Sequence, residues 1–317
     1  NAMLKQDYQT WMDQVEPDKA FQARLVEAMT AQSGRQPGPR GRTRRVGRTV
    51  LAAAVACGVL MVSAFALSPT LRQALKGALG GYAEYAQPVE GTDVSNGMEL
   101  RVVSALNGGS MLKVYAELRN LNGEPVRDPL YVDGILIPRE EGEEGAGSIT
   151  AGVEWVGYEA ESETALLEFT TWGFPTSMGD QMELIAIVLA PPGELAIEYE
   201  WHIDFTVEQL PVRSIPLTGA VSDTPLLQAD LSALGVSIQT GGWNTIDAFP
   251  LTVFCKDGRR LTLPHGGGGS MGDTRLTCWE YDEPVEPGEV AGLALGQWYI
   301  PLKGENAGQG YWLEELP

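Results

Sequence analysis

The fold is decided by residues 98–118, which read MELRVVSALNGGSMLKVYAEL. Apolar residues alternate with charged ones in the first half, and they recur at every second position from Leu112 to Leu118. A period of two places alternate side chains on one face of a β-strand, and the intervening Asn107-Gly108 is a turn signal. The stretch therefore predicts two consecutive antiparallel strands, each with one buried face.

The same alternation recurs along the chain at intervals of about ten residues, which is typical of antiparallel β-sandwiches. Asp257-Gly258 adds a two-residue hairpin signal. We predict a mainly β protein with two sandwich domains, at 88–208 and 209–317, joined by a hinge over 210–216. The other strand-like runs are 130–137, 149–156, 164–171, 181–189, 195–207, 226–238, 248–255, 260–263, 275–281, 290–295 and 298–302.

An uncharged run, TVLAAAVACGVLMVSAFAL, occupies residues 49–67 upstream of the strands. A helix of this length spans about 28 Å, close to the hydrocarbon core of a bilayer. Six arginines between residues 35 and 48 precede it, with no acid among them. The positive-inside rule predicts a single-pass protein of the cell membrane. It has a cytoplasmic helical segment (3–34), a basic linker (35–48), a transmembrane helix (49–67), a connector (68–87) and extracellular domains.

Other interpretations of the apolar run stay open. Ala64-Phe65-Ala66 has the form of a signal-peptidase site and Arg44-Arg45 that of a twin-arginine signal, although the preceding region is long for a signal peptide. Ala54 and Gly58 form a pair of small residues that could seat a helix dimer.

Charge separates the two ends of the chain. The whole sequence has 42 acids, 22 bases and a formal net charge of −20. Residues 1–48 hold nine bases and five acids, whereas residues 72–317 hold thirteen bases and thirty-seven acids. The acidic outer part argues against nucleic acid as a partner. The 44% of apolar residues exclude wholesale disorder.

Residues 17–31 are predicted to form a short helix with one apolar stripe, at Phe21, Leu25, Ala28 and Met29. A segment this small cannot bury the stripe by itself, so we expect a partner to cover it. Helix-in-groove docking uses this spacing of anchors. The alternatives are that the stripe lies on the inner leaflet or packs against residues 4–16.

Two short stretches match esterase motifs, but they lack the surrounding structure and the order of residues that an esterase requires. His265-Gly266-Gly267-Gly268 and the following Gly268–Gly272 segment imitate an esterase, but a strand follows Ser270 and both histidines precede it. We expect a hairpin loop between Leu263 and Thr274. The cysteines and histidines lack metal-ligand spacing, and the acidic residues 140–144 lack that of a calcium loop. We therefore expect that the protein is not an enzyme and binds no metal ion or cofactor.

Cys255 and Cys278 are the cysteines of the predicted extracellular part, where a disulfide is chemically allowed. If the strands zigzag, residues 260–263 lie between them and separate the Cα atoms by about 9–10 Å, too far for a bridge. The sequence does not determine the strand register, so it also leaves the disulfide undecided. Most of the tryptophans are expected in β cores, although an exposed aromatic pair could stack on a sugar.

The order of these parts resembles the family filed as domain of unknown function 4179, from Gram-positive bacteria. The resemblance rests on the basic run Arg44–Arg48, Ser68-Pro69 after the apolar segment, the strands at 96–100 and 111–118, and the closing segments 284–290 and 293–302. It implies a membrane-anchored regulator similar to anti-sigma factors, with extracellular Ig-like domains and no catalytic residues. A sigma factor is then the expected partner of residues 17–31. The alternative is a cell-surface binding or adhesion module without a signalling role, and the extracellular ligand is not indicated.

Overall fold

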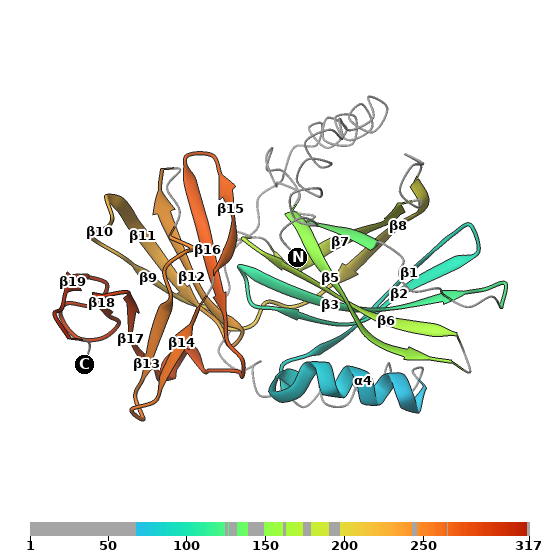
Figure 1. Cartoon of the computed structure of the whole chain (residues 1–317), viewed down its shortest axis with the longest axis horizontal. Helices are drawn as coiled ribbons and strands as arrows, with labels where there is room; N and C mark the ends of the chain where they lie inside the picture. Colours follow the sequence, from blue (N-terminus) through green and yellow to red (C-terminus); the bar gives the residue numbers. More distant parts are fainter. Residues whose placement is uncertain are drawn as a thin grey trace, which may run out of the picture. The chain divides into compact units, whose positions relative to one another are not determined.

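The computed structural model describes residues 68–123, 126, 132–138, 149–160, 163–173, 179–189, 197–242, 246–264 and 266–315. The predicted cytoplasmic segment, basic linker and transmembrane helix lie outside the described residues. Within the described ranges, no helix is long and apolar enough to cross a membrane. The described chain is mainly β, with three antiparallel sheets and one α-helix (Figure 1).

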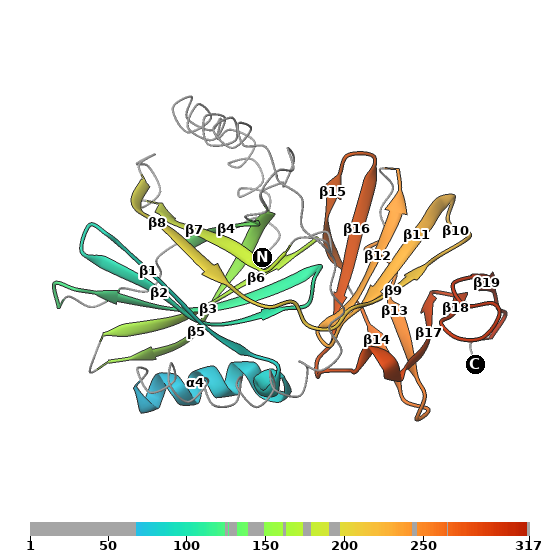
Figure 2. The ribbon, with the colours of Figure 1, turned by 180° about the vertical axis from the view of Figure 1, so that it is seen from behind.

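Strands β1 to β8 form one eight-stranded antiparallel sheet in the order β1-β2-β3-β6-β5-β4-β7-β8, here called the first β unit. Its two end strands approach each other, so the sheet is nearly closed into a barrel (Figures 1 and 2). This differs from the predicted two-sheet sandwich. The strands are β1 (Gln87–Ser95), β2 (Met98–Asn107), β3 (Met111–Asn120), β4 (Val132–Pro138), β5 (Ile149–Glu159), β6 (Thr164–Trp172), β7 (Gln181–Leu189) and β8 (Ile197–Thr206).

Hydrogen bonds from the side chains of Asp93, Ser95 and Asn96 connect β1 and the turn after it to β8, and this connection is here called the seam. Asp93 Oδ2 accepts a 2.9 Å hydrogen bond from the His202 backbone N–H, and Ser95 Oγ accepts one of 3.1 Å from that of Glu200. The Asn96 amide donates to the Glu198 carbonyl oxygen at 2.8 Å. These bonds satisfy the edge of β8 without a backbone ladder, which explains why the sheet closes instead of splitting into two layers.

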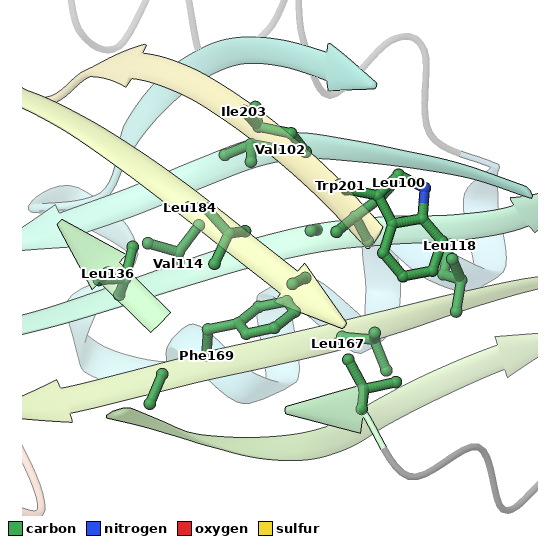
Figure 3. Packing of buried hydrophobic residues seen from close by; sticks show 14 of the residues in the cluster. Leu100, Val102, Val114, Leu118, Leu136, Leu167, Phe169, Leu184, Trp201 and Ile203 are labelled. Atoms are coloured by element: carbon green, nitrogen blue, oxygen red, sulfur yellow. The ribbon is translucent and has the colours of Figure 1, made fainter. Parts of the chain in front are cut away.

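The interior of the first β unit confirms the period of two in the sequence. Leu100 and Val102 on β2, with Val114 and Leu118 on β3, lie fully inside the core shown in Figure 3. The indole N–H of the buried Trp201 donates to the Met98 carbonyl oxygen at 3.0 Å, so its polar atom is satisfied.

Strands β9 to β19 form the second β unit, in which two antiparallel sheets enclose one core. One sheet has the order β10-β11-β12-β16-β15, with β9 paired to β11, and the other has the order β14-β13-β17-β18-β19. The bounds are β9 (Arg213–Pro216), β10 (Ala220–Val221), β11 (Thr224–Leu231), β12 (Gly235–Gly241), β13 (Leu251–Cys255), β14 (Arg260–Leu263), β15 (Gly267–Met271), β16 (Thr274–Glu280), β17 (Val290–Leu295), β18 (Trp298–Pro301) and β19 (Tyr311–Trp312), with a 3₁₀ turn at Pro287–Glu289.

The segment predicted as a hinge, 210–216, contains β9, which pairs with β11. The Arg213 guanidinium donates to the carbonyl oxygens of Pro287 and Val290, both at 3.3 Å, and to that of Leu302. Arg213 thus binds this segment to three carbonyl groups of the second β unit, whereas the two prolines by themselves would indicate an irregular linker. The expected single run 226–238 is likewise two strands, β11 and β12, joined by a turn.

Helix α4 (Pro69–Leu79) lies within the segment predicted as a connector, 68–87. The Ser68 hydroxyl caps it by accepting a 3.2 Å hydrogen bond from the Leu71 N–H, and Pro69 occupies the first turn. Leu71, Leu75 and Leu79 form one buried stripe, and Figures 1 and 2 show the helix beside β5 and β6. A 3₁₀ helix, η1 (Gly80–Glu84), follows.

A third hydrophobic cluster, here called the joint, connects the two β units. Lys113 on β3 lies 3.1 Å from Glu168 of the first unit and 2.5 Å from Glu280 of the second. The hydroxyl groups of Ser110 and Ser237 lie 2.8 Å apart across the joint. Its buried apolar members are Leu71, Leu75, Leu79, Tyr82, Ala86, Val103, Leu106, Met111, Tyr115, Leu166, Leu234, Leu276 and Cys278.

Candidate functional site

The residues predicted to bind a cytoplasmic partner, Phe21, Leu25, Ala28 and Met29, lie outside the described residues. The same holds for the acidic run 140–144. Among the residues that the structure describes, no group of three or more His, Cys, Asp or Glu side chains could hold a metal ion.

The two cysteines belong to different sheets. Cys255 on β13 faces the core of the second β unit, whereas Cys278 on β16 faces the joint, where its Sγ lies 3.7 Å from the Ser110 carbonyl oxygen. Both are buried free thiols. Burial raises the pKa of both thiols, that of Cys278 to about 12, so both stay protonated at neutral pH.

The segment that imitates an esterase motif is a strand. The predicted loop between Leu263 and Thr274 contains β15, and Ser270 on it pairs with Arg275 on β16. A nucleophile elbow requires a sharp turn from a strand into a helix. Ser270 instead lies in a β-hairpin, with its side chain at the surface.

A line of four side chains, here called the aromatic row, crosses the outer face of the five-stranded sheet. The Arg260 guanidinium lies 5.5 Å from the centre of the Phe254 ring. The Phe254 ring meets that of Tyr299 edge to face at 5.5 Å, and Tyr299 meets Tyr311 in the same way at 5.7 Å. Cation–π and edge-to-face contacts of this kind are attractive, so the row is ordered from β14 to β19.

Small residues on β17 make room for these rings. A Cβ atom at Gly292 would lie 2.8 Å from carbon atoms of the Tyr299 ring, so only glycine fits beneath it. Ala294, the strand partner of Tyr299, is fully buried on the same face. The rings therefore lie close to the sheet.

The outer end of the row is exposed. Tyr311 has 45% of its surface in solvent, and the neighbouring Trp312, on the opposite face of β19, has 64%. By contrast, Trp201 and Trp279 are fully buried, as expected for most tryptophans. The sequence held a signal for the exposed pair, because two adjacent aromatic residues in one strand cannot both face the same core.

Beside the seam, His202 lies between two carboxylates. Its Nδ1 is 3.1 Å from Glu183 Oε1 and its Nε2 is 3.1 Å from Glu200 Oε1. Partial burial lowers the pKa of His202, but its hydrogen bonds to Glu183 and Glu200 outweigh this effect and raise the pKa above its usual value. When His202 is protonated, it forms ion pairs that join β7 to β8.

Neither the protein-family models nor the curated proteins include a match to this chain. Among solved structures, a conserved domain protein from Bacillus anthracis is similar, with a TM-score of 0.46 and 13% identity, over 68% of this chain and 77% of that one. A DUF4785 family protein from Legionella pneumophila has a TM-score of 0.23 and 14% identity, over 69% of this chain and 58% of that one. These similarities are too weak to carry an argument about function.

Proposed function

We propose that the chain is a single-pass membrane regulator of the anti-sigma-factor type. Residues 68–317 would form its extracellular sensor, residues 49–67 its transmembrane helix, and residues 17–31 its binding segment for a sigma factor. The observation that carries the proposal is that α4 begins directly after the apolar run and packs into the joint between both β units.

The way α4 is attached supports the transmission of a signal from the β units to the predicted transmembrane helix. Ser68 has φ −60° and ψ 157°, outside the helical region, so α4 begins directly after this residue. Leu71 and Leu75 are then buried in the joint, and the Tyr82 hydroxyl bonds to the second unit at the Tyr281 carbonyl oxygen. No free linker separates residue 68 from the folded body, so a displacement of that body would pull on the segment before it.

The joint supports the same role, because it ties the two β units together by buried contacts. Lys113 is mostly buried between carboxylates of both units, and it is costly to separate a buried cation from its partners. A ligand on either unit would therefore act on α4. As part of this proposal, the two-sheet second unit corresponds to an Ig-like domain of the resembling family.

External protease on intact cells tests the topology. We expect residues 68–317 to be digested and an antibody tag before residue 3 to stay protected. Protection of the outer part, or digestion of the tag in unbroken cells, would contradict the proposed orientation.

The second candidate function is a cell-surface binding module without signalling. The exposed end of the aromatic row favours it, because a ring that is half in solvent is available for a ligand. Under this candidate, residues 1–48 would be only a cytoplasmic tail, and residues 49–67 would anchor the protein.

A further inference from the structure

The strand positions along the aromatic row carry no acidic residues, which is unusual for this chain. By strand register, one line across the sheet holds Thr262, Thr252, Ala294, Tyr299 and Tyr311. The adjacent line holds Arg260, Phe254, Gly292 and Pro301. No Asp or Glu occupies these strand positions, although the whole sequence has 42 acids against 22 bases.

The chemistry of this face defines its ligand. It offers ring faces and edges at Tyr299 and Tyr311, hydroxyl groups at Thr252 and Thr262, and a single cation at Arg260. One cation is too little for a polyanion, which needs several to replace its counterions. These positions also lack Leu, Ile, Val and Met, so an apolar protein partner would find no aliphatic patch to bury.

A pyranose sugar has the complementary chemistry. Its C–H face packs on an aromatic ring through dispersion and weak polar attraction, and its hydroxyl groups pair with hydroxyl and guanidinium groups at the rim. Five strands at the usual spacing extend over roughly 19 Å, which is room for several sugar units.

We propose that the aromatic row, with Thr252 and Thr262 beside it, is a binding site for an uncharged pyranose glycan. This proposal rests on the second candidate function, and it would also supply a ligand to the sensor of the first. Tyr311 is the outermost ring and carries the stacking contact. Its ring meets that of Tyr299 edge to face, and the Tyr299 ring in turn meets that of Phe254.

The test is calorimetric titration of the full chain in lipid nanodiscs, because detergents with sugar headgroups would compete. The probes are hexamers of β-1,4-linked glucose and of β-1,4-linked N-acetylglucosamine, with a galacturonate hexamer as the anionic counterpart. We expect one neutral hexamer to bind with a dissociation constant below about 1 mM, and the galacturonate hexamer to bind at least about tenfold more weakly.

Variants locate the site. Tyr311→Ala should weaken binding by about tenfold or more, whereas Tyr311→Phe should stay within about threefold of the parent protein, because it keeps the ring. Tyr158→Ala is the matched control, since Tyr158 is 41% exposed on β5 and lies outside the row. Tyr311 lies on an exposed edge strand of two residues, so its loss should leave the fold intact. Arg260→Ala should also weaken binding, at the other end of the row.

Absence of binding by both neutral hexamers at about 1 mM would overturn the proposal. So would binding that Tyr311→Ala leaves unchanged, or equal binding of the galacturonate hexamer. Capture of a protein partner through the row without glycan binding would also contradict it. Each of these results leaves the regulator proposal intact, because that is tested on the topology and on residues 17–31.

Discussion

The Tyr82 hydroxyl donates a 2.6 Å buried hydrogen bond to the carbonyl oxygen of Tyr281, 199 residues further along the chain. Tyr82 follows α4, and Tyr281 follows β16 of the second β unit. Burial, followed by the nearby Glu280, raises the pKa of Tyr82, so the hydroxyl stays a donor over the whole physiological range. The bond links the start of the described chain to the domain furthest from it in sequence.

Tyr82→Phe should lower the free energy of unfolding of residues 68–317 by about 1–3 kcal/mol, because it leaves a buried carbonyl group without its donor. The matched control is Tyr85→Phe. Tyr85 also bonds to the second unit, at Glu286 Oε1 and 2.6 Å, but in an exposed position, so we expect less than about 0.5 kcal/mol. Urea unfolding followed by tryptophan fluorescence measures both values. Equal effects of the two variants would show that the buried hydrogen bond contributes no more to stability than the exposed one.

Lys113→Met should destabilise the same fragment by about 2–4 kcal/mol, because Glu168 and Glu280 would face each other without a cation. Lys256→Met is the control, because Lys256 Nζ lies 3.5 Å from Glu289 Oε1 in an exposed ion pair. It should change the free energy of unfolding by less than about 0.5 kcal/mol. If the joint couples the two units, the Lys113 variant should also unfold in two steps where the parent protein unfolds in one. A single transition with unchanged midpoint would contradict this account of the joint.

His202 predicts a dependence of stability on pH. Its pKa is raised in the folded state, so its contribution is fully present below the unfolded value of about 6.5 and is lost as the pH rises through the folded pKa. The free energy of unfolding should therefore fall as the pH rises above about 6.5, and His202→Gln should flatten this slope. Urea titrations at several pH values measure it. An unchanged slope in the variant would mean that other groups cause it.

Ser270→Ala should leave stability within about 0.5 kcal/mol, because Ser270 is an exposed residue of a hairpin strand. A fluorophosphonate probe, which reacts with activated serines, should not label the parent protein. Stoichiometric labelling at Ser270 would restore the esterase hypothesis.

The sequence predicted most strands of the first β unit because one face of each is buried, as in Leu112–Leu118, where the period of two is strict. It did not indicate β1, whose polar residues such as Asp93 and Ser95 close the seam through side chains. Near-closure of the sheet depends on these long-range contacts, and local alternation carries no information about them. Similarly, the prolines of residues 210–216 indicate an irregular linker, but Arg213 holds this segment in place. Its three carbonyl partners lie more than seventy residues away in sequence, so local patterns could not reveal them.

The candidate site was harder to predict. The exposed ring of Tyr311 could be expected from its neighbour Trp312, but the row could not, because Phe254, Tyr299 and Tyr311 meet only through the strand order β13-β17-β18-β19.

The most direct test of the central claim is binding of the full chain, in nanodiscs, to the sigma factors of its own cell. We predict binding that Phe21→Asp and Leu25→Asp each weaken by roughly a hundredfold, because each places a charge in a buried interface. Gln22→Asp, which adds the same charge beside the apolar stripe, should have little effect. Absence of binding by the parent chain, or equal loss in all three variants, would contradict the regulator proposal and favour the surface-binding module.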